Sequence, residues 1–366
     1  MELASLIVAT PPRENAGSRT TKQYDYQKDV SLHKLIEHYQ KSTDFVFIFD
    51  FHDDLLIFDK ENNPDKIEFF QIKSKHTGNI TLNWLKSKGI DEKLSIVGKL
   101  YHNKVLFSDY AKSISIISNQ PYNIDLKDPN ESSLAKFKIE CKELSAESIN
   151  LIKAAIQKEH GLPNPPSIEA LFYLTRSKLS LEDSASHCSG SLSQLFHALN
   201  PNYSTNVELA YRSLFNEIRI KSAAIIGDSD QKSWEKLKQI KGITRKQFHQ
   251  MLDKAGVYKS LEDAWKEIEG VLQADGMGYL EVKKLKADWR TVNARILSDS
   301  SNLPLNQLIN EVDRVIAELK GSPRHQQSKL TELMKEGLDK LGDAIKPPFD
   351  TSFVKALILR QLHHEA

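Results

Sequence analysis

The spacing of apolar residues changes its period along the first part of the chain. In residues 21–41, apolar side chains recur at intervals of three and four, which predicts a helix with one buried face. Residues 45–49 are apolar throughout and rich in strand-forming types, so they predict a strand buried on both faces. Residues 55–58 and 67–73 predict two further strands. Residues 1–21, with prolines and a glycine among polar neighbours, predict an arm or loop.

The pattern continues with further helices and strands. Residues 82–103 predict a helix, and residues 114–117 predict a fourth strand. Around Ile139 apolar residues alternate with lysines and an acid, which predicts a half-exposed edge strand. Residues 146–160 predict a helix that ends at Gly161. The order helix, three strands, helix, strand indicates an α/β fold with the αβββαβ core that is typical of restriction-endonuclease-like proteins.

The character of the sequence changes beyond residue 166, and after about residue 206 almost every segment predicts a helix. We therefore expect two domains, an α/β domain over residues 1–165 and a mostly helical domain over residues 166–366 that serves oligomerisation or partner binding. One helical stripe has nearly heptad spacing, which is typical either of a seam between two chains or of the core of a helical domain. Its members are Leu305, Leu308, Val312 and Val315.

Composition limits the class of protein. The chain has 366 residues, 27% of them charged, and a formal net charge of +1, which is ordinary for a globular protein. No apolar run is long enough to span a bilayer, and the apolar N-terminal stretch lacks a basic lead-in, so neither a membrane segment nor a secretory signal is expected. The two cysteines form no CxxC pair, which argues against a zinc knuckle and fits a protein of the reducing cytoplasm.

Candidate catalytic groups follow the first three predicted strands in a fixed order. Asp50, Asp53 and Asp54 lie between the first and second strands. Gln71 and Lys73 lie two residues apart on the third strand, so both project to one face. Carboxylate and amide oxygens are hard ligands that suit Mg²⁺ or Mn²⁺, and a nearby lysine can stabilise the charge that develops during phosphodiester hydrolysis. We expect Asp54, Gln71 and Lys73 to be catalytic, with the metal held by the three acids and Gln71; the alternative is a polar turn beside an exposed strand face.

Other residues extend this candidate site. Gln27 lies near the start of the first predicted helix, where it is either a further catalytic residue or an ordinary helix residue. Residues 71–104 carry seven lysines against two acids, which predicts either a surface for DNA phosphates or a solvated helix face. The expected DNA-binding residues are Arg19, Lys75, Lys86, Lys88 and Lys93.

Several segments together resemble a known family of nucleases. They are RENAGSRTTKQYDYQ at 13–27, FDFHDDLLIFD at 49–59, NPDK at 63–66, FFQIKSK at 69–75, SIVGKLYHNKVLF at 95–107 and SISIISNQPYNI at 113–124. They resemble the double-stranded-DNA nuclease domain of bacterial anti-phage effectors, a PD-(D/E)xK domain that is fused to cyclic-oligonucleotide sensors in CBASS systems and forms the nuclease subunit of Lamassu systems. The resemblance implies metal-dependent cleavage of duplex DNA, with Asp54, Gln71 and Lys73 at the family's D-QxK positions. Asp50 and Asp53 occupy the acidic positions just before them.

The C-terminal half decides between the two contexts of that family. Residues 206–366 predict helices rather than an α/β sensor, so the chain looks more like the Lamassu nuclease subunit. That resemblance implies an SMC-like ATPase complex as partner. We therefore expect a bacterial cytoplasmic endonuclease that acts as a homo-oligomer under the control of partner proteins. The alternatives are a catalytically degenerate module that binds DNA or a partner, and a restriction or repair nuclease or an RNase.

Overall fold

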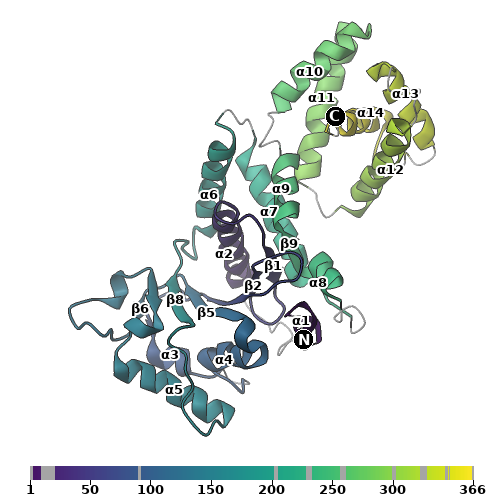
Figure 1. Cartoon of the computed structure of the whole chain (residues 1–366). Helices are drawn as coiled ribbons and strands as arrows, with labels where there is room; N and C mark the ends of the chain where they lie inside the picture. Colours follow the sequence, from purple (N-terminus) through teal and green to yellow (C-terminus); the bar gives the residue numbers. More distant parts are fainter. Residues whose placement is uncertain are drawn as a thin grey trace. The chain divides into compact units, whose positions relative to one another are not determined.

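The computed structural model describes most of the chain. The described residues are 3–9, 21–89, 92–201, 205–227, 233–255, 261–298, 302–321, 328–342, 345 and 347–364. The chain divides into two compact units (Figure 1). Unit 1 comprises Met1–Leu192 and Ile218–His249, and unit 2 comprises Ser193–Glu217 and Gln250–Ala366.

Unit 1 contains a seven-stranded mixed sheet with the strand order β7-β8-β5-β3-β2-β1-β9. Its strands are β1 (Val46–Phe49), β2 (Leu55–Phe58), β3 (Ile67–Lys73), β5 (Ala111–Ser118), β7 (Lys138–Glu140), β8 (Phe172–Arg176) and β9 (Gly242–Thr244). β3, β5 and β8 run parallel to one another, whereas β1, β2 and β3 form an antiparallel meander and β9 pairs antiparallel with β1. A separate two-stranded sheet joins β4 (Ile80–Thr81) and β6 (Tyr122–Asn123).

Helices accompany this sheet. They are α1 (Leu3–Ala9), α2 (Thr21–Tyr39), α3 (Leu82–Lys86), α4 (Ile96–Phe107), α5 (Ala146–His160) and α8 (Trp234–Lys241), with short 3-10 turns at Ser108–Tyr110, Ser133–Ala135 and Cys141–Glu143. Figure 1 shows α3, α4 and α5 grouped together and α2 apart from them. The two groups of helices contact neighbouring residues of β3, whose side chains point to opposite faces of the sheet. Phe69 packs its ring against Phe107 of α4, whereas Lys34 of α2 lies over the ring of Phe70.

Hydrogen bonds and tight packing fix the ends of two elements. The hydroxyl of Ser95 caps α4 by accepting from the Gly98 N–H at 3.2 Å, and Glu159 of α5 accepts from the backbone N–H and hydroxyl of Ser95. At Gly242, where β9 begins, a Cβ atom would approach the Lys238 carbonyl oxygen to 2.6 Å. Only glycine therefore lets β9 leave α8 this closely and pair with β1.

Unit 2 is helical. It contains α10 (Leu261–Ala274), α11 (Tyr279–Ser298), α12 (Leu303–Lys320), α13 (Leu330–Leu341) and α14 (Thr351–His364). Three helices, α6 (Ser184–Leu199), α7 (Val207–Ala223) and α9 (Arg245–Lys254), contribute residues to both units. The near-heptad stripe of α12, which includes Leu305 and Val312, is buried inside unit 2 within one chain. This stripe is therefore core, and it does not provide the seam between chains that was one of its two interpretations.

Most elements expected from the sequence are present. The order helix, three strands, helix, strand is confirmed, and Gly161 ends α5 in the left-handed conformation with φ of 61°. Two predictions were wrong. Residues 3–9 form a helix rather than an arm, and the helix expected over residues 82–103 is two helices, α3 and α4.

The expected boundary at residue 165 does not coincide with the division into units. β8 lies beyond that boundary and pairs with β5, because its apolar residues complete the parallel part of the sheet. β9 comes from still later in the chain. Within the described ranges, no helix is both long and apolar enough to cross a membrane.

Candidate active site

A five-residue loop between β1 and β2 carries the acids. It is closed by two backbone hydrogen bonds, from Asp50 N to Asp54 O at 3.2 Å and from Phe51 N to Asp53 O at 3.3 Å. Asp50 has φ of 49°, a left-handed conformation that aspartate tolerates better than most residues. The loop thus holds Asp53 and Asp54 directly before β2.

β3 extends beyond its partner β2, and this leaves part of its edge unpaired by the sheet. The last pair in the register is Leu55 with Phe70. Further along β3, the N–H of Ile72 donates to Asp54 Oδ2 at 2.6 Å, and its carbonyl oxygen accepts from Gln27 Nε2 at 3.0 Å. Side chains of the loop and of α2 therefore satisfy backbone groups that a longer β2 would have bonded.

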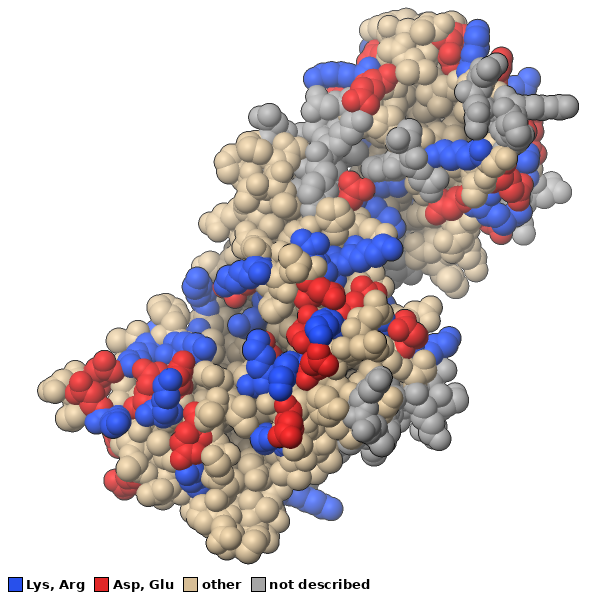
Figure 2. Space-filling view, viewed as in Figure 1, with Lys and Arg blue, Asp and Glu red and all other residues tan. Residues whose placement is uncertain are grey.

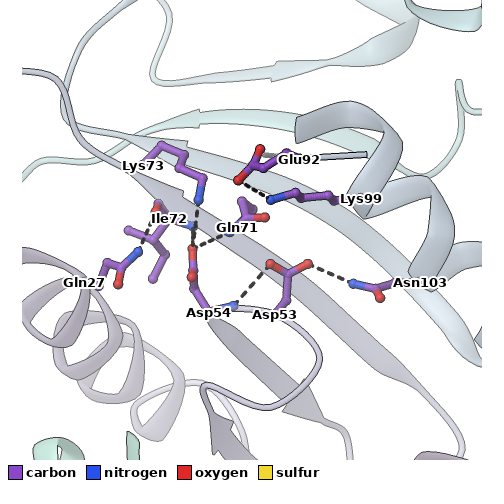
Figure 3. Close-up of polar contacts among 9 residues, drawn as sticks. All are labelled: Gln27, Asp53, Asp54, Gln71, Ile72, Lys73, Glu92, Lys99 and Asn103. Atoms are coloured by element: carbon purple, nitrogen blue, oxygen red, sulfur yellow. Dashed lines mark hydrogen bonds and ion pairs between the residues drawn. The ribbon is translucent and has the colours of Figure 1, made fainter. Parts of the chain in front are cut away.

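Asp54 brings the expected catalytic residues together (Figure 3). Its Oδ2 also accepts from Gln71 Nε2 at 2.7 Å and lies 4.0 Å from Lys73 Nζ. The side chains of Asp54 and Lys73 are 6% and 17% exposed. Because the two charges stand at the limiting distance of an ion pair and Lys73 still reaches water, the Lys73 ammonium can also attract a further anion.

Asp53 faces a different partner, Asn103 of α4. Its Oδ2 accepts from Asn103 Nδ2 at 2.8 Å, and its Oδ1 accepts from the N–H of Asp54 at 3.2 Å. Asn103 is fully buried, and its Oδ1 has no hydrogen-bond partner within the described part of the chain. Asp53 therefore adjoins Asp54 but belongs to a buried pair with α4.

Asp50 interacts with lysines on other elements. Burial lowers the pKa of both Lys28 and Lys241, and the negative charge of Asp50 partly opposes that shift in each. Lys241 Nζ also donates to the backbone oxygen of Asp50 at 2.9 Å. His52, in the same loop, packs edge-on against the rings of Phe51 and Phe107.

The expected DNA-binding residues do not gather around one group in the way that the expected catalytic residues gather around Asp54. Lys75 lies just after β3, and its Nζ donates to the Asn79 carbonyl at 3.0 Å. Lys86 is half-buried at the end of α3, whereas Lys88 and Lys93 are exposed in the segment before α4. Arg19 lies outside the described residues. On the face drawn in Figure 2, basic side chains are interspersed with acidic ones rather than forming a continuous basic surface.

Two features of the site were not singled out from the sequence. One is Asn103, the partner of Asp53, and the other is the ion pair between Lys99 of α4 and Glu92. Lys99 and Asn103 are four residues apart and so lie on one helix face. That spacing could have shown from the sequence that the two side chains share a face of α4. The sequence pattern of the strands does not say whether that face packs on the sheet.

The donor atoms fit a hard divalent cation. Asp54 supplies a carboxylate and Gln71 an amide, whose oxygen faces Asp54 if the amide group rotates by half a turn. Among the described residues, no three His, Cys, Asp or Glu side chains are placed to hold a metal ion. Carboxylate and amide oxygens are the hard ligands that Mg²⁺ prefers, and this ion usually keeps several waters.

Comparison with known proteins supplies the family. A family model described as "Cap4, dsDNA endonuclease domain" matches residues 15–222, a range that contains every expected catalytic residue. The Lamassu protein LmuA of Bacillus cereus (strain VD014) is 29% identical over 150 residues, a match that spans 40% of this chain and 40% of that relative. No solved structure matches the chain. The chain belongs to the Cap4 dsDNA endonuclease domain family.

Proposed function

We propose that this chain is a metal-dependent endonuclease that cleaves double-stranded DNA in bacterial anti-phage defence. The convergence of Asp54, Gln71 and Lys73 at the open end of β3, in a member of this nuclease family, carries the proposal. The similarity to a Lamassu protein supports the anti-phage role, and the sequence resemblance described above implies the PD-(D/E)xK class.

Asp54 and Gln71 would hold the cation. When bound, Mg²⁺ or Mn²⁺ would polarise a phosphodiester and make a bound water more acidic. Lys73 places a positive charge beside Asp54, where it can stabilise the negative charge that develops on the phosphate. Gln27 holds the strand backbone at Ile72 and so positions the residues on either side of it.

Metal removal tests this proposal directly. Plasmid DNA is incubated with the chain in Mg²⁺, in Mn²⁺ and in excess EDTA, with its partner proteins present. Cutting in either metal and its loss in EDTA are expected, and an Asp54→Asn variant should behave like the EDTA sample. Undiminished cutting in EDTA would refute metal dependence. Digestion of duplex DNA, single strands and RNA in parallel distinguishes the proposed substrate from an RNase activity.

Control by assembly is the second part of the proposed function. A duplex nuclease without restraint would cut the host chromosome, so we infer a resting state that is released by oligomerisation or by a partner, an SMC-like ATPase complex by the resemblance. Cutting both strands of a duplex generally needs two active sites, so the active state is at least a dimer. Light scattering and cleavage, measured in parallel with and without partner and DNA, test this. Efficient double-strand cutting by a chain that stays monomeric would overturn it.

A further inference from the structure

Lys99 is a buried lysine beside the candidate site. It lies on α4 with 5% of its surface exposed, and its Nζ donates to Glu92 Oε1 at 2.6 Å. A lysine is rarely buried this completely unless its charge is paired. Glu92 thus compensates a charge that the fold has withdrawn from water.

The orientation of α4 directs Lys99 toward the catalytic cluster. Asn103, one turn further along the same helix face, bonds to Asp53, the neighbour of Asp54. Phe107, one turn beyond, packs against Phe69 of β3, which lies on the strand face that also carries Gln71 and Lys73. Figure 3 draws the Lys99–Glu92 ion pair in one view with Lys73 and Gln71, and the charge of Lys73 acts on the Glu92 carboxylate.

The Glu92 carboxylate has the surroundings that suit a phosphate. Its Oε1 accepts from Lys99, and its Oε2 accepts from the Gly89 N–H at 3.2 Å. Burial raises the pKa of Glu92, but Lys99, the Gly89 N–H and the charge of Lys73 together lower it below its ordinary value. Two ammonium groups and a backbone N–H are typical phosphate-binding groups in proteins.

The two partners of the pair differ in exposure. The Glu92 side chain is 38% exposed, whereas that of Lys99 is 6% exposed. Glu92 can turn into water at little desolvation cost, but Lys99 cannot follow it. Another anion can then take the place that the carboxylate leaves beside Lys99.

We propose that Lys99 is a second phosphate-binding lysine of the nuclease site, and that the Glu92 carboxylate occupies its phosphate subsite until DNA displaces it. The proposal rests on the function proposed above, because it places a DNA phosphate at that site. It adds a residue that holds the substrate and a built-in competitor that weakens DNA binding.

Binding measurements on variants test the exchange. Fluorescence anisotropy with a labelled duplex, in Ca²⁺ in place of Mg²⁺, gives the affinity over a range of salt. Lys99→Met should weaken binding roughly fivefold and reduce the slope of log K against log salt by about 0.9, the value for one neutralised phosphate. Glu92→Gln, which keeps an oxygen for Lys99 but removes the competing charge, should tighten binding roughly fivefold.

The double variant separates exchange from two independent effects. Glu92→Gln combined with Lys99→Met should bind like Lys99→Met alone, because Glu92 has nothing to block once Lys99 is gone. A matched control is the Lys153–Glu169 ion pair, in which the glutamate is likewise 38% exposed and the lysine lies on α5. Lys153→Met and Glu169→Gln should leave DNA affinity unchanged.

The outcomes are distinguishable. If wild-type protein binds duplex and needs Lys73 to cut it, yet the Lys99 and Glu92 variants bind like wild type, this inference is wrong and the proposed function stands. If wild-type protein neither binds nor cuts duplex with its partners present, both fail. Should Lys99→Met not fold, Glu92→Gln decides alone, since unchanged or weaker binding contradicts a competing carboxylate.

Discussion

Units 1 and 2 each bury a cation beside a polar partner, but they surround it differently. In unit 1 the partner of Lys99 is the half-exposed Glu92. In unit 2 Arg360 is 3% exposed, and its Nε donates at 2.8 Å to Oδ1 of Asn293, which is itself 1% exposed. Burial lowers the pKa of Arg360 to about 10. A pair in which both partners are buried stabilises the core around it, whereas a pair with one exposed partner can exchange that partner for a ligand.

The largest effect should come from Lys73→Ala, which tests whether unit 1 is organised around catalysis. Loss of the ammonium beside Asp54 should reduce the cleavage rate by at least about 10²–10³-fold, while a partly exposed position should change the free energy of unfolding by about 0.5 kcal/mol or less. Plasmid cleavage and thermal denaturation measure the two quantities. Lys112→Ala, at an exposed position of β5, is the control and should cut normally.

In unit 2 we expect the reverse, a large change in the free energy of unfolding rather than in activity. Asn293→Ala removes the acceptor of a buried guanidinium and should lower the free energy of unfolding by about 3 kcal/mol. Chemical denaturation monitored by tryptophan fluorescence is suitable, because Trp265 and Trp289 lie in that core with ring centroids 6.0 Å apart. A loss of DNA affinity in folded Asn293→Ala protein, without loss of stability, would break the distinction between the two units.

A smaller effect tests the basic segment around α3 and α4. Changing Lys86, Lys88 and Lys93 together to glutamate should weaken duplex binding for all sequences alike and make it less dependent on salt. The slope of log K against log salt should fall by about 0.9 for each phosphate that these lysines neutralise in the wild-type complex. Thermal denaturation should change little, since Lys88 and Lys93 are exposed. Unchanged affinity would place the DNA on another surface.

The smallest effect is expected from thiol reagents. Burial raises the pKa of the Cys141 thiol to about 12, and it also raises the pKa of Cys188. Both thiols are therefore protonated at neutral pH and poorly nucleophilic. Mass spectrometry should find neither alkylated in the folded protein and both alkylated after denaturation. Rapid labelling of native protein would mean that one of these cores opens.

The candidate site was predictable because its residues lie on or directly beside strands that follow one another closely in the sequence. Strand periodicity predicted that Gln71 and Lys73 share one face, and the antiparallel pairing of β2 with β3 brings Asp54 to Gln71 in the structure. The partner of Asp53 and the Lys99–Glu92 pair were not predictable, since they depend on which face of α4 packs on the sheet. The sequence singled out Asp54 for catalysis but did not decide which of the three acids holds the metal. In the structure Asp54 accepts from Gln71, whereas Asp53 accepts from Asn103.

The fold was less predictable where distant segments meet. β8 is a short apolar run, and such a run has no period that distinguishes a strand from a helix. β9 has only three residues and lies between two helices, so helical periodicity on both sides concealed it. Its pairing with β1 is a tertiary contact across about two hundred residues of sequence, and local propensity carries no information on it.

The late position of β9 has a consequence for synthesis on the ribosome. Domains usually fold from the N-terminus as the chain emerges, but the sheet of unit 1 acquires its last strand only after Gly242–Thr244 has been made. Until then β1 is an edge strand of four apolar, fully buried residues, and such an edge pairs readily with other chains. A nascent chain arrested after residue 222, where the family match ends, would carry the candidate active site but not β9. We expect such a fragment to aggregate rather than accumulate as a free nuclease.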